Sequence, residues 1–369
     1  MAHVWTRAAL LALVAAALSQ AAAQQLVRVL LDERAGPVTI SMEGAHRGAF
    51  DGRSFATPFS LAWPVVAVDG RLWVDGREVG RQLDLAADAG TVLWDGRRYR
   101  GALRLLARGD TLMVLNVVEL ESYLRGVVPA EMQATWPLDA LRAQAVAART
   151  YTLVNLSPSG PYDVCATSDC QVYRGVSIEH PRSDQAVADT VGQVLTYQGT
   201  FARTYYHADS GGVIASSAEV WGMAIPYLSA FRDVRSVGPH SVWDARLDPV
   251  VVARHLAAAG HHVGAVQRVR VLGYSESGRV SGLEVIGSTG RVTLDALSAR
   301  RQARAWGLKS TLFQMTGDLS VRGAGWGHGV GMSQYGARTL ALEGYGYGQI
   351  LGFYYPDTQL QRVTVVAER

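Results

Sequence analysis

Residues 115–156 read LNVVELESYLRGVVPAEMQATWPLDALRAQAVAARTYTLVNL, and the predicted fold is organised around this stretch. The sequence predicts a strand, a short helix, a tight turn at V-V-P-A-E-M and then a long helix beginning at Pro137. Proline suits the first turn of a helix, where its missing N–H needs no partner. Apolar side chains then recur every three or four residues, which predicts one buried stripe. Arg142, Gln144 and Arg149 fall outside that stripe.

Glu131 is the one carboxylate inside the V-V-P-A-E-M turn. Its neighbours are apolar, and such surroundings disfavour the anion, so we expect this carboxyl to hold its proton more tightly than a solvated one. A general acid working near neutral pH needs that property. On spacing alone, the alternative is a structural Glu that stabilises the first turn of a helix. Both interpretations stay open at this point.

The N-terminus is typical of a cleavable signal peptide over residues 1–23. A short basic segment precedes an apolar run at 8–18, and three alanines at 21–23 offer a cleavage site. The run is too short to span a bilayer. We therefore expect an exported protein without a transmembrane helix after signal cleavage, in the periplasm, the cell envelope or the extracellular space. A retained N-terminal anchor is the alternative.

Composition excludes several classes of function. The chain has 369 residues, 49% of them hydrophobic, which is enough core for about two domains. Its formal net charge of +3 is too small to argue for a nucleic-acid partner. Lys309 is the only lysine, which disfavours Schiff-base or Ser–Lys chemistry.

Residues 24–114 are predicted to form a β-rich N-terminal region. Short runs rich in Val, Leu and Trp alternate with Asp-Gly pairs. Both residues of such a pair tolerate positive φ, as a two-residue hairpin turn requires. The pairs are Asp51-Gly52, Asp69-Gly70, Asp75-Gly76 and Asp95-Gly96.

Cys165 and Cys170 are the only two cysteines, too few for a disulfide framework. In an exported protein a disulfide between them is favoured. Zinc at this pair is the alternative, but a zinc site needs about four ligands and no His lies between positions 156 and 179. Apart from that alternative, no cofactor is expected.

Two further segments carry polar residues beside glycines. A strand predicted at 201–206 runs into H-A-D-S-G-G at 207–212, where the glycines would let a ligand approach the backbone. A tight hairpin with a solvated His is the alternative. Residues 240–315 show helix and strand patterns without a dense polar cluster, so this block is interpreted as an inserted α/β lobe that serves as scaffold.

Residues 323–336 read GAGWGHGVGMSQYG. Five alternate glycines are unfavourable in an ordinary strand, and they leave a face that another backbone or a flat ligand can approach. Ser333 is expected to cap a helix over 334–343. The spacing does not match a G-x-S-x-G nucleophile turn or a phosphate-binding loop.

Four motifs in this order resemble the SpoIID/LytB family, which includes stage II sporulation protein D and the amidase enhancer LytB. They are V-V-P-A-E-M with L-R-A-Q-A-V-A-A-R-T-Y, then C-x4-C-Q-V-Y, H-x-x-S-G-G and G-W-G-H-G-V-G-M-S-Q-Y-G-A. The resemblance covers about residues 26–360. It implies an α+β fold, with a β-rich N-terminal part and a mixed α/β catalytic core over 115–360 that forms an open glycan-binding groove.

The resemblance also implies a function. The family acts on peptidoglycan, and its sporulation members are lytic transglycosylases that cleave glycan strands denuded of stem peptides to 1,6-anhydro-muramic products. The family's catalytic Glu matches Glu131. One departure is Asp169, because many members carry a His directly before the second Cys and bind zinc nearby.

Such a reaction needs only one carboxylate, whereas hydrolysing glycosidases usually need two. Asp209 is the candidate for a second. The expected substrate-binding residues are Arg149, His207, Ser210, Gly211, Gly212, Gly327, His328, Gly329, Ser333 and Gln334. We expect the H-A-D-S-G-G turn and the glycine run to lie beside Glu131 in one groove. His328 is expected to face that groove, because its glycine neighbours cannot bury it.

The alternative from another class is a non-catalytic glycan-binding protein that stimulates a cell-wall amidase. The expected partners are therefore glycan strands and, in this alternative, an amidase. A metal-dependent peptidase using His207 and His328 is disfavoured, because the two lie in unrelated motifs.

Overall fold

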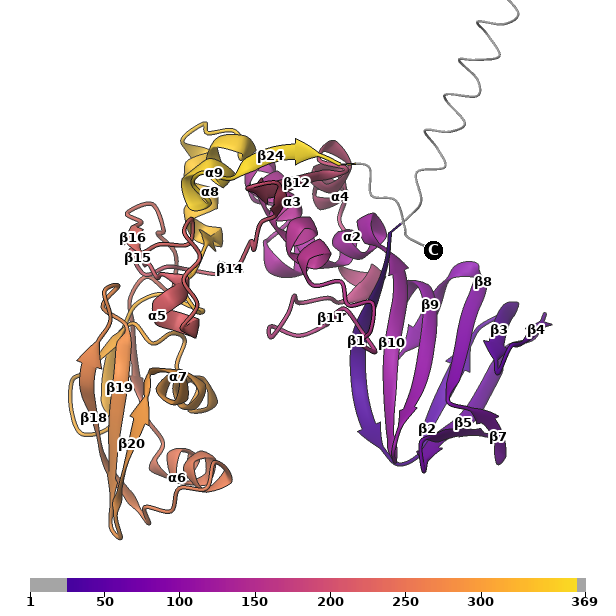
Figure 1. The fold of residues 1–369 in the computed structure, drawn as a ribbon, viewed down its shortest axis with the longest axis horizontal. Coiled ribbons are helices and arrows are strands. Elements are labelled where there is room, and N and C mark those ends of the chain that lie inside the picture. The colour runs from indigo at the N-terminus through magenta and orange to yellow at the C-terminus, as the bar shows by residue number, and fades with distance from the viewer. Residues whose placement is uncertain (1–24, 364–369) are drawn as a thin grey trace, which may run out of the picture. The chain divides into compact units, whose positions relative to one another are not determined.

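The computed structural model describes residues 25–363 (Figure 1). The predicted signal peptide lies outside these residues. The chain forms two compact units. Of the described residues, the first unit takes 25–134, 152–194 and 361–363, and the second takes 135–151 and 195–360. The linear domain boundaries at 114/115 and around 240–315 stay a prediction.

Two antiparallel sheets build most of the first unit. The larger sheet has the strand order β11-β1-β10-β9-β8-β3-β4, and the smaller one has the order β2-β5-β6-β7. The strands are β1 (Leu26–Ala35), β2 (Val38–Met42), β3 (His46–Phe50), β4 (Arg53–Thr57), β5 (Leu61–Val68), β6 (Arg71–Val74), β7 (Arg77–Gly80), β8 (Gln82–Trp94), β9 (Arg97–Arg108), β10 (Thr111–Glu119) and β11 (Val164–Cys165). Only β11 joins in parallel, beside β1.

The four Asp-Gly pairs form the predicted hairpin turns. Their aspartates have φ between 45° and 49°, and their glycines have φ between 72° and 75°. Positive φ at both positions matches the right-handed twist of the flanking strands, which explains why Asp-Gly recurs at these turns.

Helix α2 (Leu120–Glu131) corrects the predicted turn at V-V-P-A-E-M. The helix continues through Val127, Val128 and Pro129 and ends at Glu131, so the chain turns only afterwards. Val127 and Val128 are fully buried, and this packing extends the helix although Pro129 removes one of its hydrogen bonds. The N-terminus of α2 is capped by Glu119, whose carboxylate accepts from two backbone N–H groups.

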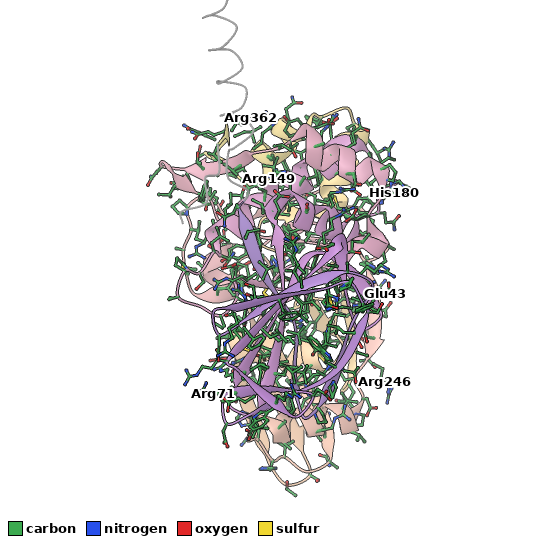
Figure 2. All side chains as sticks on the ribbon, turned by 90° about the vertical axis from the view of Figure 1, so that its right-hand side faces the viewer. Glu43, Arg71, Arg149, His180, Arg246 and Arg362 are labelled. Atoms are coloured by element: carbon green, nitrogen blue, oxygen red, sulfur yellow. A yellow bond between two sulfur atoms is a disulfide. The ribbon has the colours of Figure 1, made fainter. Side chains whose placement is uncertain are left out.

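Helix α3 (Leu138–Val154) follows, and its residues 138–151 belong to the second unit. The predicted stripe is buried at Leu141, Ala145 and Ala148, but burial extends beyond it, because Gln144 and Arg149 are fully buried too. Arg149 is labelled in Figure 2. Asp139 and Arg142 stay half-buried, so the buried face of α3 is wide without covering the whole helix.

Short strands and helices make up the rest of the chain. They are η1 (Gly175–Ile178), α4 (Pro181–Asp189), β12 (Gln193–Tyr197), β13 (Thr200–Phe201), β14 (Tyr206–His207), β15 (Val213–Ile214), α5 (Ser217–Trp221), β16 (Phe231–Arg232), β17 (Trp243–Arg246), α6 (Pro249–Ala258), β18 (Val266–Tyr274), β19 (Val280–Gly287), β20 (Arg291–Asp295), α7 (Ala296–Ala305), β21 (Phe313–Met315), β22 (Ser320–Gly323), β23 (Met332–Ser333), α8 (Gln334–Leu342), α9 (Tyr347–Tyr354) and β24 (Gln359–Arg362).

The strand predicted at 201–206 is instead two short strands, β13 and β14, with residues 202–205 between them. The break occurs because Arg203 N–H donates to the Tyr227 hydroxyl at 2.7 Å rather than to a neighbouring strand.

One lobe of the second unit has a hydrophobic core of its own, formed by buried side chains between Trp243 and Val321. Figure 1 shows α6 and α7 on one side of the β18–β19–β20 sheet. The α+β class predicted from the sequence is confirmed. Among residues 25–363, no helix is long and apolar enough to cross a membrane.

Candidate functional site

Glu131 is the last residue of α2, and its side chain is half-buried. One carboxylate oxygen, Oε1, accepts a hydrogen bond of 2.7 Å from the backbone N–H of Val172. A short hydrogen bond from a backbone donor fixes the position of a carboxylate better than a mobile side chain would. The carboxylate is therefore held in place on a residue that is only half-buried.

The segment that supplies Val172 is itself braced. Cys165 and Cys170 form a disulfide with Cα atoms 5.3 Å apart, and Tyr173 N–H donates to Ala166 O across the loop. The buried side-chain oxygen of Gln171 accepts from the hydroxyls of Tyr123 (3.2 Å) and Thr152 (2.8 Å). Since Tyr123 lies on α2, the helix that carries Glu131 and the loop that holds it are bonded together at a second point.

Tyr173 adds a further contact between the same helix and loop. Its ring packs directly on Gly126 of α2, where a Cβ would come within 2.5 Å of the ring. Its hydroxyl donates to Asn116 Oδ1 at 2.8 Å, and burial raises the pKa of this phenol, so it stays a neutral donor. The sequence motif C-Q-V-Y contains these residues, but a backbone donor such as Val172 N–H has no sequence signal.

Within residues 25–363, no group of three His, Cys, Asp or Glu side chains is arranged to hold a metal ion. Cys165 and Cys170, the zinc ligands of the alternative, are bonded to each other in the disulfide that the sequence favoured.

In the second unit, the H-A-D-S-G-G turn and the glycine run lie side by side. β14 pairs with β23 in parallel, which places His207 opposite Ser333. Asp209 and Trp326 exchange backbone hydrogen bonds of 2.8 and 3.1 Å. Motifs more than 100 residues apart in the sequence therefore form one structure in this unit.

The glycines of the run face the protein itself, which corrects the prediction of a smooth wall for a sugar ring. Gly329 has φ +84°, and a Cβ there would lie 2.1 Å from the guanidinium of Arg279. At Gly327 a Cβ would lie 2.8 Å from Cβ of His207. These positions are glycine because other parts of the chain occupy the space of a side chain.

His207 is buried, and its Nδ1 lies 3.1 Å from Val330 O, so Nδ1 carries the proton that is donated. Burial lowers the pKa of His207 to about 3, and the nearby Arg279 guanidinium contributes to this shift. His328 Nδ1 accepts from the backbone N–H of Val330 at 3.0 Å. Both imidazoles are therefore neutral at physiological pH.

The expectation that nothing bulky contacts His328 was wrong. Its ring packs against Trp221 (centroids 5.1 Å apart), His207 (5.4 Å) and Tyr205 (6.3 Å). The pKa of His328 is lowered well below its usual value, mainly by burial. The glycines next to His328 have no side chains, but residues distant in sequence pack against its ring.

Asp209 is buried, and hydroxyl and amide donors bond both of its oxygens. Oδ1 accepts from Ser236 Oγ (2.8 Å) and Gly211 N–H (2.9 Å), and Oδ2 accepts from Ser241 Oγ (3.1 Å). Ser236 Oγ also contacts Ser333 Oγ at 2.8 Å. Asp209 thus holds the two motifs together, and this is the role that the geometry supports for it.

The side chains of Ser210, Ser333, Gln334 and Arg149 are also buried. Ser333 caps α8 as expected, accepting from Gly336 N–H at 3.2 Å. Arg279 was missed by the sequence reasoning: it is buried, donates to Ser210 O at 3.1 Å, and burial lowers its pKa to about 10. The substrate-binding roles predicted for this set, and a common groove with Glu131, stay predictions.

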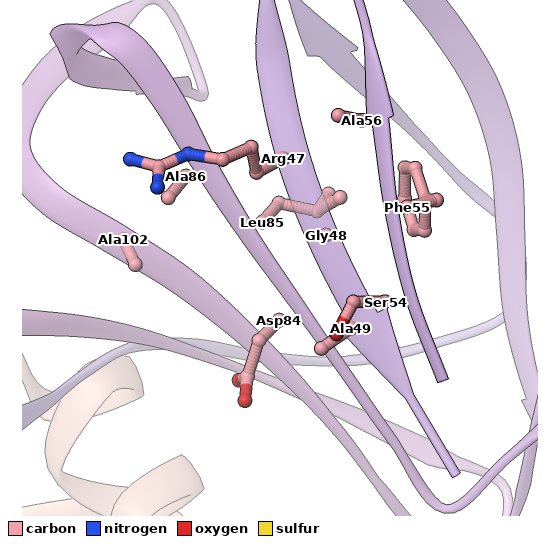
Figure 3. A pocket seen from close by; sticks show the side chains of 10 residues that line it. All are labelled: Arg47, Gly48, Ala49, Ser54, Phe55, Ala56, Asp84, Leu85, Ala86 and Ala102. Atoms are coloured by element: carbon pink, nitrogen blue, oxygen red, sulfur yellow. The ribbon is translucent and has the colours of Figure 1, made fainter. Parts of the chain in front are cut away.

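A hollow of about 700 Å³ lies on the seven-stranded sheet of the first unit (Figure 3). Small side chains from β3, β8 and β9, such as Ala49, Ala86 and Ala102, form much of its lining. Asp84 lines it too, but is paired with Arg104 at 2.7 Å. None of the predicted site residues lines this hollow, so it forms no part of the candidate site.

These features define an α+β protein with one half-buried carboxylate at a helix end, braced by a disulfide loop, and a second unit built on a glycine run. The Stage II sporulation protein family matches residues 108–197, which include Glu131 and the disulfide loop. A domain of unknown function matches residues 243–331. The chain belongs to the SpoIID/LytB family.

Two named relatives support this assignment, and a third, uncharacterised relative matches most of the chain. Stage II sporulation protein D of Bacillus subtilis is 33% identical over 270 residues, covering 66% of this chain and 74% of that protein. The amidase enhancer of the same organism is 32% identical over 286 residues, covering 64% of this chain but only 40% of the relative. An uncharacterised protein of Brachyspira hyodysenteriae is 31% identical over 342 residues, covering 90% and 92%.

Proposed function

We propose that this protein is an exported lytic transglycosylase that cleaves peptidoglycan glycan strands denuded of stem peptides, with Glu131 as its acid–base group. The observation that carries the proposal is the Glu131 carboxylate, which is half-buried and held by Val172 N–H at 2.7 Å. A general acid must be fixed in position and still reach its substrate. Family membership adds support, because the matched region contains this carboxylate.

Glu131 acts twice in the proposed reaction. Its carboxyl proton passes to the glycosidic oxygen as the C1–O bond breaks. The C6 hydroxyl of the same muramic acid ring then bonds to C1 and gives its proton to the Glu131 carboxylate. The product ends in a 1,6-anhydro ring, no water is consumed, and Glu131 is protonated again. A second carboxylate is unnecessary, which agrees with the structural role of Asp209.

The second unit is proposed to hold the strand through residues on its two motifs. Neutral imidazoles, hydroxyls and amides suit sugar hydroxyls and N-acetyl groups. The proposed set is Arg149, His207, Ser210, Gly211, Gly212, Gly327, His328, Gly329, Ser333 and Gln334. Because most of these side chains are buried, backbone groups and small local rearrangements would make the contacts.

The alternative is a glycan-binding protein without catalytic activity that stimulates a cell-wall amidase. One specific observation favours it: the relative at 32% identity is named an amidase enhancer. This function needs glycan binding and an amidase partner, but no acid at position 131.

Digestion of purified denuded strands tests the first proposal. Mass spectrometry should detect 1,6-anhydro-muramic ends, and Glu131→Gln should reduce their rate of formation by about two powers of ten or more. Glu121→Gln, on the same helix, is the matched control and should keep activity. Retained cleavage in Glu131→Gln would exclude the assigned role. Stimulation of an amidase by both wild type and Glu131→Gln, without anhydro products from either, would establish the alternative.

A further inference from the structure

We propose that Trp326, His240 and Lys309 form a glycan subsite that takes a sugar ring bearing a free carboxylate. The proposal rests on the proposed function, because it names a feature of the same substrate. It was not part of the expected binding set, which took other residues from the glycine run.

Trp326 is an exposed aromatic side chain in a run whose glycines pack against the protein. The residue is 47% exposed. Its backbone is nevertheless fixed, because its N–H donates to Asp209 O at 2.8 Å and its carbonyl accepts from Asp209 N–H at 3.1 Å. A rigid, exposed indole loses little conformational freedom when an apolar face of a ligand stacks on it.

His240 and Lys309 lie beside that indole. The His240 and Trp326 rings are in contact edge to face, with centroids 4.4 Å apart and planes at 90°. The Lys309 ammonium donates to His240 Nδ1 at 3.0 Å. The glycine run fixes both partners, since Gly325 N–H donates to His240 O at 2.8 Å and Gly327 N–H donates to Lys309 O at 2.9 Å.

Lys309 is the cation beside this indole, and the buried Asp209 is a carboxylate near His240. The pKa of His240 is lowered by burial and by the neighbouring ammonium, so its imidazole is neutral near pH 7. Asp209, the nearby carboxylate, is satisfied by Ser236, Ser241 and Gly211. In the part of the chain that the structure describes, Lys309 forms no ion pair with a carboxylate within 4.0 Å. The ammonium is thus available to an anionic group of a ligand.

An aromatic face beside an ammonium fits a sugar acid. The C–H face of a pyranose stacks on the indole, and a carboxylate at the ring's edge pairs with Lys309. In peptidoglycan the lactyl group of muramic acid is a free carboxylate only where the stem peptide has been removed. The subsite would therefore distinguish denuded strands from strands that carry peptides, in which the same group is an amide.

The test measures binding in a Glu131→Gln background, so that strands stay intact. The probes are denuded strands and the same strands after carbodiimide coupling to methylamine, which converts each lactyl carboxylate into a neutral amide. Lys309→Met should weaken binding of the denuded strands about fivefold, the scale of a partly exposed ion pair, and leave binding of amidated strands unchanged. Lys309→Arg should retain the preference. Trp326→Ala should weaken both about tenfold.

Arg254→Met, an exposed charge change of the same size on α6, is the matched control and should alter neither affinity. The Lys309 substitutions leave the backbone hydrogen bond from Gly327 in place, and the thermal midpoint of each variant checks that the fold is retained. If Lys309→Met leaves the preference for denuded strands intact, or weakens both probes equally, the subsite is wrong. That failure differs from failure of the proposed function, which is read separately from cleavage by the Glu131 variants.

Discussion

Gly329→Ala should destabilise the second unit far more than a glycine substitution at an equally strained but open position. Gly329 has φ +84°, a conformation that costs an L-residue about 1–2 kcal/mol. The added Cβ would also lie 2.1 Å from Nη2 of Arg279, a buried side chain that donates to Ser210 O. Overpacking of this kind costs about 1–3 kcal/mol. The expected total is therefore about 2–5 kcal/mol.

Two control variants separate these contributions. Gly344 has φ +91° with nothing within 4 Å of the position a Cβ would take, so Gly344→Ala measures the backbone cost alone. Gly352 lies in α9 with ordinary φ and open space, so Gly352→Ala should be stabilising by about 0.5–1 kcal/mol. Calorimetry on the full chain gives all three values. If Gly329→Ala costs no more than Gly344→Ala, the close contact with Arg279 does not constrain this position, and the explanation of the glycine run fails.

Two further predictions concern stability. Replacing both Cys165 and Cys170 by Ala should lower the free energy of unfolding by about 2 kcal/mol. It should also slow cleavage, because the loop that carries Val172 N–H becomes less rigid. Unchanged cleavage would refute the idea that the disulfide holds this loop in place. In the folded protein the pKa of His207 is lowered to about 3, so the unfolded chain binds a proton at a higher pH than the folded one does. The free energy of unfolding should therefore fall by up to about 1.4 kcal/mol per pH unit as the pH drops from about 6.5 towards 3. His207→Gln should flatten that pH dependence in denaturant titrations, and an unchanged slope would contradict it.

Local rules predicted the parts of the fold that depend on neighbouring residues. The positive φ of Asp69 and Gly70 follows from the pair itself, as does the Ser333 cap of α8. The end of α2 was misplaced, because burial of Val127 and Val128 outweighs the effect of Pro129. Tertiary packing therefore overrides a local helix-breaking signal.

The candidate site was predictable only in part, for a similar reason. The acid could be singled out because it lies in a distinctive motif. The donor that holds it could not, because any residue at position 172 except proline offers a backbone N–H. Arg279 comes directly after Ser277-Gly278, and no sequence motif marks it as a functional residue. Its position against Gly329 depends on a contact with a residue 50 positions away in the sequence. Neither the backbone donor at position 172 nor this long-range contact can be predicted from the order of residues in the sequence motifs.

The glycine run has a consequence for mutational scanning of this chain. At Gly323, Gly325, Gly327, Gly329 and Gly331, a Cβ would lie within 2.0 to 2.8 Å of another part of the protein. In a library of all single substitutions, every second position from 323 to 331 should therefore tolerate no residue other than glycine. Trp326 lies between two of these positions and is exposed. Substitutions of Trp326 should therefore leave the abundance of the protein unchanged but lower its glycan binding.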